Sequence, residues 1–272
     1  MKHEIVRIRS GAWAMRSLVA NEVMHPGLGP VLEAETLYVA QSRLAERLCD
    51  GSTNAPLVLF DVGLGAGSNA IAAFRAAHAV TAPARRLAII SFERDLEPFE
   101  LASAEEERFG FTGAARLAAR ALLAGKSHED ERVTWTLVRG ELPGSLVAAA
   151  ALADVIFWDP YSPRANPELW TIAAFAAARA KAGPHATLFT YSASTASRAA
   201  LVLAGWAVGA GASTGNKGET TMAAIEVGDL VAPLERQFLR RIALVDAPRP
   251  LDAPVDWVAQ VGAAAQFTSV PR

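Results

Sequence analysis

Cysteine is nearly absent from this 272-residue chain, with Cys49 as its only representative. A single cysteine excludes an intramolecular disulfide framework and zinc sites that need several cysteines. The five histidines do not follow the spacing of metal ligands. We therefore expect no metal site.

Long hydrophobic runs and an excess of charge are also missing. No stretch of about 18 uncharged apolar residues occurs, so no transmembrane helix is expected. The first ten residues carry several charges and no apolar signal core, and a cytoplasmic protein is expected. The net charge of −2 provides no general basic field for nucleic acid, so an RNA contact would need a local basic patch. The hydrophobic fraction of 51% nevertheless predicts a real core.

The most informative stretch is Leu57–Asn69, which reads L-V-L-F-D-V-G-L-G-A-G-S-N. Its apolar run ends at Asp61 and predicts a buried parallel strand. Gly63, Gly65 and Gly67 allow the backbone to approach a bound molecule, and the N-terminus of a following helix offers unpaired N–H groups. Together they predict a nucleotide-type site at the first turn from strand to helix.

The glycines alone leave the ligand open. From Gly65 onward they match G-x-G-x-x-A, a pattern typical of dinucleotide binding. The acid before the glycines and the wide loop favour S-adenosylmethionine, which has no pyrophosphate and whose carboxylate can meet helix N–H groups. Glu93 ends the next predicted strand and is compatible with both ligands, because an acid there can bind ribose hydroxyls.

Strands and helices alternate from residue 57 onward, which predicts an α/β fold with helices on both faces of a mostly parallel sheet. We expect an N-terminal extension over residues 1–55, a core over 56–228, and a C-terminal amphipathic helix and surface tail over 229–272 that do not form an independent domain. The expected strands are 57–61, 86–93, 132–139, 154–158, 186–191, 206–210 and 220–227. The expected helices are 35–48, 97–109, 114–124, 167–181, 194–204 and 233–245.

Asp159 follows the fourth predicted strand and opens a loop that contains Pro160 and Pro163. Ligands of open α/β sheets bind at the carboxyl ends of the strands, so we expect Asp159 in the same crevice as the glycine loop. Two prolines fix φ at two positions, which suits a loop that holds a reactive atom in line with a methyl group. A rigid connection capped by Asp159 is the structural alternative.

These motifs resemble the methyltransferase domain of the MnmC-like family, the enzymes that make 5-methylaminomethyl-2-thiouridine at the wobble position of tRNA. The family's G-x-G-x-G-x-N loop is matched at residues 63–69 and its I-S-x-E segment at 90–93. Its D-x-F-x-P-x-x-N-P-x-x-W-T loop is matched at 159–171, with tyrosine at the third position, and its E-T-x-Y-V segment at 35–39. The resemblance covers roughly residues 17–227.

The resemblance implies a class I methyltransferase (Rossmann-like) fold with a seven-stranded sheet, S-adenosylmethionine as methyl donor and tRNA as partner. The expected reaction is N-methylation of the aminomethyl group of wobble uridine, with Asp159 as the catalytic residue that accepts a hydrogen bond or a proton from the amine. The implied cofactor-binding residues are Asp61, Gly63, Leu64, Gly65, Gly67, Asn69, Glu93, Arg94, Glu141 and Asp159. The implied substrate-binding residues are Glu35, Tyr38, Pro160, Tyr161, Ser162 and Pro163. A stand-alone methyltransferase without the family's flavin-dependent half is expected.

Two differences from the family's sequence pattern leave the identity of the methyl acceptor undecided. The loop at residues 213–219 has one lysine where family members often carry several cations, and the family's tyrosine-containing segment is replaced at residues 22–26. Another RNA, a small amine, or a non-catalytic binding protein of the same fold are the alternatives. A hydrolase is disfavoured, because Ser68 lies behind the glycine loop and His185 begins a strand. A nicotinamide oxidoreductase would account for the glycines but would not explain Asp61 or the Asp159 loop.

Overall fold

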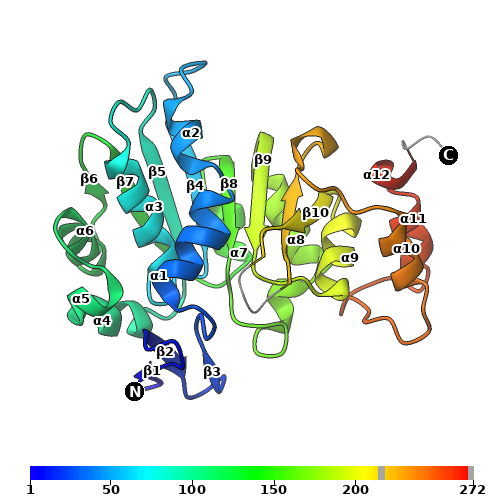
Figure 1. The fold of residues 1–272 in the computed structure, drawn as a ribbon, viewed down its shortest axis with the longest axis horizontal. Helices are drawn as coiled ribbons and strands as arrows, with labels where there is room; N and C mark the ends of the chain where they lie inside the picture. Colours follow the sequence, from blue (N-terminus) through cyan, green and yellow to red (C-terminus); the bar gives the residue numbers. More distant parts are fainter. Residues whose placement is uncertain (214–217, 269–272) are drawn as a thin grey trace.

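A central sheet of eight strands organises the computed structural model, which describes residues 1–213 and 218–268 (Figure 1). The strand order is β10-β11-β9-β8-β4-β5-β7-β6. The strands are β4 (Leu57–Val62), β5 (Leu87–Glu93), β6 (His128–Glu129), β7 (Val133–Arg139), β8 (Ala153–Trp158), β9 (Ala182–Thr190), β10 (Ala207–Gly211) and β11 (Thr220–Ala224).

The predicted α/β class with a mostly parallel sheet is confirmed. Strands β9, β8, β4, β5 and β7 pair in parallel, whereas β10 and β11 form an antiparallel pair and β11 runs antiparallel to β9. All seven expected strands are present. The eighth, β6, is antiparallel to β7 and only two residues long, too short for an alternating pattern to reveal it.

The helices cover two faces of the sheet, and each face has its own apolar core. Successive side chains of β4 alternate between them, with Leu57 and Leu59 in one core and Phe60 and Val62 in the other. The helices that follow β4 along the chain are α3 (Ser68–Ala79), α4 (Glu97–Ala104), α5 (Glu106–Phe109), α6 (Ala114–Leu123), α7 (Gly144–Ala148), α8 (Ile172–Ala180) and α9 (Thr195–Leu203), with short 3₁₀ turns η2 (Pro167–Trp170) and η3 (Val227–Asp229).

Three predicted helices are interrupted in the structure. The one expected at 35–48 consists of α1 (Pro30–Glu33), the π-helical segment η1 (Ala34–Ala40) and α2 (Leu44–Cys49), and it breaks before α2 at Arg43, whose φ is 54°. The helix expected at 97–109 divides at Glu105, and the helix expected at 167–181 divides at Thr171. The Thr171 hydroxyl accepts the Ala174 N–H and thereby caps α8. Apolar spacing continues through such breaks, so periodicity does not locate them.

Strand β9 begins earlier than the predicted 186–191 and includes Gly183 and Pro184. The register between β8 and β9 shifts near Ala153 and Val155, an irregularity of the kind that accommodates proline in a sheet. The antiparallel hairpin of β10 and β11 is confirmed. Its connecting residues 214–217, including the lone lysine of the loop, lie outside the described residues.

The N-terminal residues form a small antiparallel sheet of β1 (His3–Arg7), β2 (Trp13–Ser17) and β3 (Glu22–Val23), close to the end of the central sheet where the α1 segment begins (Figure 1). Lys2 and His3 reach α4, because the Lys2 backbone N–H and the His3 ring both contact the Glu97 carboxylate at 2.7 Å. The N-terminal sheet is therefore fixed against the core by polar contacts near the site described below.

The C-terminal residues contain more helix than the single one that we expected. Helix α10 (Arg236–Ile242) is a shorter form of the predicted helix, but α11 (Trp257–Gly262) and α12 (Ala265–Thr268) follow it. Trp257 and Phe267 are buried in the same core as α8 and α9, and this apolar burial is the reason why the segment folds. The prolines between α10 and α11 interrupt the helical spacing of apolar residues, so the sequence did not predict these helices. In the described part of the chain, no helix is long and apolar enough to cross a membrane.

Candidate active site

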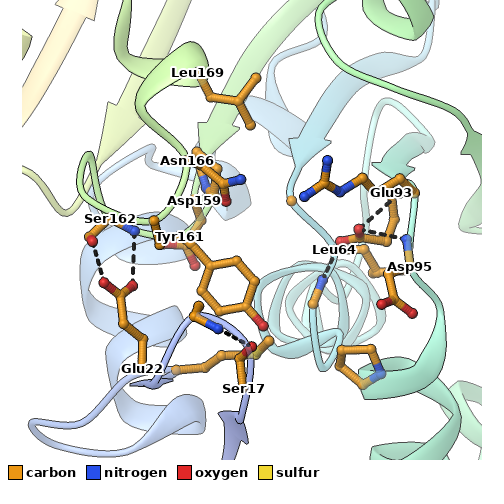
Figure 2. A pocket seen from close by; sticks show the side chains of 18 of the residues that line it. Ser17, Glu22, Leu64, Glu93, Asp95, Asp159, Tyr161, Ser162, Asn166 and Leu169 are labelled. Carbon is orange, nitrogen blue, oxygen red and sulfur yellow. Dashed lines mark hydrogen bonds between the residues drawn. The ribbon is translucent and has the colours of Figure 1, made fainter. Parts of the chain in front are cut away.

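The carboxyl ends of β4, β5 and β8 open into a cavity of about 1220 Å³ (Figure 2). It lies where the strand order reverses, with β5 on one side of β4 and β8 on the other, the position at which open α/β sheets bind ligands. Ligand sites typically measure roughly 300–1,000 Å³, so this cavity has room for a nucleoside-sized cofactor and part of a second molecule.

The glycine loop forms one wall of the cavity. Gly63 has a φ of +88°, and a Cβ there would lie 2.9 Å from the Asp159 carbonyl oxygen. Gly65 has a φ of +52°, and its Cβ would meet Met24 Sδ at 3.2 Å. These positions need glycine both for their left-handed backbone and for the close approach of neighbouring chain. Gly67 instead packs on Phe99, away from the cavity.

Glu93 ends β5, and its carboxylate connects the glycine loop with the loop that follows β5. Its Oε2 accepts the Gly65 N–H at 3.1 Å, and its Oε1 accepts the N–H groups of Arg94 and Asp95 at 2.8 and 3.0 Å (Figure 2). The carboxylate is thus held at the cavity wall with lone pairs left for ribose hydroxyls. At the rim, Arg94 Nη1 contacts Glu141 Oε2 at 3.1 Å.

The geometry fits S-adenosylmethionine. Gly63 and Gly65 have no Cβ, and this leaves room for the amino-acid part of the cofactor. The Glu93 carboxylate is held in place and is suited to bind the ribose hydroxyls. Gly63, Leu64 and Gly65 would face the amino-acid part and Glu93 the ribose, with Arg94 and Glu141 beside the base. Bound there, the cofactor supplies a methyl group activated by a sulfonium.

Asp159 follows β8 and lines the cavity beside Gly63, with a side chain that is 11% exposed. Its Oδ1 accepts the Tyr38 hydroxyl at 2.7 Å, and its Oδ2 accepts Asn69 Nδ2 at 2.6 Å and lies 3.5 Å from His25 Nε2. Burial raises the pKa of Asp159, Glu33 adds to that effect, and His25, Tyr38 and Asn69 oppose it.

The loop that carries Asp159 is held from several sides. Trp170 Nε1 donates to the Tyr161 carbonyl at 2.9 Å, and the Tyr191 hydroxyl donates to the Pro160 carbonyl at 3.2 Å. The Ser162 N–H and hydroxyl both donate to the Glu22 carboxylate of β3 (Figure 2). Such fixed positioning is what an in-line transfer requires.

Most of the predicted site residues do converge on the cavity. Those that line it are Gly63, Leu64, Gly65, Glu93, Arg94, Glu141, Asp159, Pro160, Tyr161 and Ser162. Asp61, Gly67, Asn69 and Tyr38 lie behind this lining. Tyr38 and Asn69 act on the site through Asp159, whereas Asp61 Oδ2 accepts the Ser91 hydroxyl at 2.7 Å inside the core.

Two predicted substrate-binding residues, Glu35 and Pro163, lie outside the cavity lining, and their contact with a substrate stays a prediction. Pro163 is exposed and does not line the cavity. Glu35 is exposed as well, because the turn from α1 to η1 directs Glu33 and Tyr38 inward and Glu35 toward solvent. Glu33 lines the cavity in its place, and its Oε1 accepts the Gly27 and Leu28 N–H groups at 3.0 Å each.

Sequence reasoning missed three side chains of the site: His3, His25 and Glu33. His3 Nε2 lies 3.1 Å from the Tyr161 hydroxyl. His25 lies between Glu33 and Asp159, at 3.4 and 3.5 Å. Their spacing along the chain carries no signal, because the N-terminal sheet and the α1 segment bring them to the cavity only in the folded protein.

Acidic side chains predominate around the cavity. Among the lining residues, the Lys and Arg side chains are Lys2, Arg94, Arg139 and Arg164, and the Asp and Glu side chains are Glu22, Glu33, Glu93, Asp95, Glu141, Asp159 and Glu168. Three of the four cations pair with acids of the same set, Lys2 with Asp95, Arg94 with Glu141 and Arg164 with Glu22. The cavity thus suits a cationic ligand. In the described residues, no group of three or more His, Cys, Asp or Glu is arranged to hold a metal ion.

Comparison with protein families finds a match over residues 115–226, to a family described as S-adenosyl-L-methionine-dependent methyltransferase. Among solved structures, MnmC2 from Aquifex aeolicus is similar, with a TM-score of 0.71 and 25% identity. That match covers 95% of this chain and 85% of the other.

Curated relatives carry the name tRNA 5-methylaminomethyl-2-thiouridine biosynthesis bifunctional protein MnmC. The protein from Pseudomonas paraeruginosa is 31% identical over 200 residues, and the one from Paraburkholderia xenovorans is 28% identical over 196 residues. Each match covers 68% of this chain and 29% of the relative. The chain therefore spans less than a third of the length of these two relatives.

Proposed function

We propose that this S-adenosylmethionine-dependent methyltransferase, a relative of the MnmC proteins, methylates the primary amine of a 5-aminomethyl-uridine in tRNA. The observation that carries the proposal is the convergence of the Gly63–Gly65 loop, Glu93 and Asp159 on one cavity. The first two suit the methyl donor, and the third faces the space left for an acceptor.

An amine acceptor agrees with the charge of the cavity. An ammonium ion is attracted by the carboxylates of Glu33 and Asp159, which lie on either side of His25 in the part of the cavity that we call the acceptor end. The ammonium has no lone pair, so one proton must leave before the nitrogen attacks. Asp159 is placed to accept that proton and to orient the amine, and in-line positioning supplies most of the acceleration.

A tRNA acceptor is supported by the names of the relatives and by the Asp159 loop motif. Phosphate contacts require cations, and the net charge of the chain is −2. Lys2, Arg7, Arg9 and Arg16 lie within or next to the first two strands of the N-terminal sheet, whose His3 and Ser17 line the cavity. Lys2 pairs with Asp95 and Arg16 with Glu4, so Arg7 and Arg9 are the exposed cations that this sheet offers to phosphate.

The test is methyl transfer from labelled S-adenosylmethionine to tRNA isolated with 5-aminomethyl-uridine at the wobble position. Nucleoside mass spectrometry should detect the methylaminomethyl product with the wild-type protein. Asp159→Asn should bind S-adenosylmethionine by calorimetry yet lose transfer by about a hundredfold or more. Cofactor binding without transfer to this tRNA would contradict the tRNA proposal, and a wild-type protein that does not bind the cofactor would contradict the enzyme itself.

A small amine is the second candidate acceptor, and the excess of carboxylates over cations around the cavity favours it. The same assay with a diamine or a polyamine in place of tRNA separates the two. Transfer to the small amine at a rate equal to or above that of the tRNA would assign the acidic cavity to a free cationic substrate.

A further inference from the structure

His25 lies between two buried carboxylates at the acceptor end of the cavity. Its Nδ1 is 3.4 Å from Glu33 Oε2, and its Nε2 is 3.5 Å from Asp159 Oδ2. The three side chains are 5–11% exposed, and all three line the cavity. A carboxylate near each ring nitrogen stabilises the imidazolium form, in which both nitrogens carry a hydrogen.

The backbone at His25 is held in an uncommon conformation. Its φ is 53°, a left-handed value that few non-glycine residues adopt. The next residue is Pro26, and a residue before proline ordinarily prefers extended backbone. Such conformations persist only where the surrounding structure enforces them, and they cluster at active sites.

Glu33 supplies part of that enforcement. While Oε2 faces the His25 ring, Oε1 accepts the N–H groups of Gly27 and Leu28, which close the turn after His25. One buried carboxylate therefore orients the ring and also fixes the loop that carries it. This double role shows that the ring is built into its position beside Asp159.

Acidic and phenolic groups act on Asp159 from several elements. Besides His25, the titratable groups that interact with it electrostatically include Glu33 of α1, Tyr38 of η1, Asp61 of β4 and Tyr191 after β9. Of the groups named, only His25 can carry a positive charge.

We propose, on the basis of the function proposed above, that His25 is a positioning residue that keeps Asp159 ionised for the acceptor amine. Burial and Glu33 oppose the charged form of Asp159, and the His25 imidazolium offsets them. The ionised carboxylate then binds the acceptor ammonium and takes one proton from it.

The ammonium gives one proton to the Asp159 carboxylate and becomes a neutral amine with a free electron pair. That pair forms the new N–C bond while the C–S bond of the donor breaks, and its electrons remain on sulfur as the sulfonium becomes a thioether. The product leaves as a secondary ammonium, and Asp159 returns its proton to solvent. His25 keeps its own protons throughout.

Kinetics of His25→Gln test the role, with His185→Gln as the matched control because His185 is 81% exposed and does not line the cavity. Without the cation, the acid limb of the profile of kcat against pH should move up by about one pH unit. Activity should recover toward the wild-type value at high pH, and the affinity for S-adenosylmethionine should be unchanged. His25→Lys, which restores a cation, should move the acid limb back. An equal loss at every pH, without rescue by lysine, would mean that His25 is only structural.

A second measurement needs no substrate. The chain has five histidines, so the His25 imidazole can be followed by ¹⁵N NMR as a function of pH. Its titration midpoint should fall in Asp159→Asn and in Glu33→Gln relative to the wild type. An unchanged midpoint in both variants would overturn the proposal, whatever the protein methylates. If the midpoint falls in these variants but the protein does not methylate tRNA, the interaction of His25 with Asp159 and Glu33 is supported and the proposed tRNA acceptor is contradicted.

Discussion

Tyr38 and Asp159 are separated by 121 positions in the chain, yet the Tyr38 hydroxyl donates a hydrogen bond of 2.7 Å to Asp159 Oδ1. Tyr38 comes from the π-helical segment η1, and Asp159 follows β8. Burial raises the pKa of Tyr38 well above its ordinary value, and the charge of Asp159 raises it further. The phenol therefore stays protonated and remains a donor. An N-terminal segment thus positions the carboxylate at the end of a central strand.

Tyr38→Phe should weaken methyl transfer more than cofactor binding. The substitution keeps the ring against Phe157 but leaves Asp159 Oδ1 without this donor in a buried setting. We expect kcat to fall by about tenfold and the protein to lose about 1–3 kcal/mol of stability. The Kd of S-adenosylmethionine, measured by calorimetry, should change by less than about twofold. Equal losses of kcat and cofactor affinity would contradict a role through Asp159.

Gly65→Val should weaken S-adenosylmethionine binding. A β-branched side chain is strained at a φ of +52°, and its Cβ would press on Met24 at the cavity wall. We expect the Kd from calorimetry to rise by more than about tenfold. Gly144→Ala is the control, because its Cβ would meet nothing within 4 Å and its φ is outside the left-handed range. Wild-type affinity in the valine variant would place the cofactor elsewhere.

Asp61 makes stability depend on pH. Burial raises its pKa from 3.8 to about 7, with Asp159 and Glu93 adding to the shift and the Ser91 hydroxyl opposing it. Between these two values the folded protein holds a proton that the unfolded chain has released. The contribution of Asp61 to the free energy of unfolding therefore falls as the pH rises from about 4 to 7, by up to about 4 kcal/mol, and is constant above that range.

Asp61→Asn removes this titration. Relative to the wild type, the variant should gain stability as the pH rises from 4 to 7, as measured by urea unfolding at a series of pH values. Asp246→Asn is the control, since Asp246 is exposed. A difference between Asp61→Asn and the wild type that does not change with pH would show that Asp61 is ionised in the folded protein over this range.

Gln266 should stabilise the edge of the central sheet that β10 forms. Its Oε1 accepts the Val208 N–H at 2.8 Å, and its Nε2 donates to the Val208 carbonyl at 2.8 Å, so one side chain pairs with the edge strand β10 as a neighbouring strand would. Gln266→Ala leaves the buried Val208 N–H without this acceptor, whereas the Val208 carbonyl still accepts the Leu234 N–H at 2.9 Å, and the substitution should cost about 1–3 kcal/mol in urea unfolding. Gln260→Ala, which loses only an exposed bond to Asp256, should cost less than about 0.5 kcal/mol. Equal effects would contradict the assignment.

Local patterns were sufficient for seven of the eight strands of the central sheet. The runs at 57–62 and 154–158 are mostly apolar because both faces of these strands are covered. A strand of this kind can therefore be recognised from its residue types alone. The glycine loop and Glu93 were identified for the same kind of reason, since a left-handed turn and a strand end each restrict the residue at one position. The C-terminal helices were missed, because their apolar side chains are sparse and prolines precede them.

By itself, the sequence determined the α/β class, the donor loop and the presence of an acid after the fourth predicted strand, because each depends on residues close together in the chain. The acceptor end was decided only by the tertiary structure. Glu33 and His25 reach Asp159 from an N-terminal segment more than 120 positions away, and Glu35, which matches a motif, turns out to solvent. Contacts between distant segments depend on how α1 and η1 pack across the sheet, and no local spacing encodes that packing.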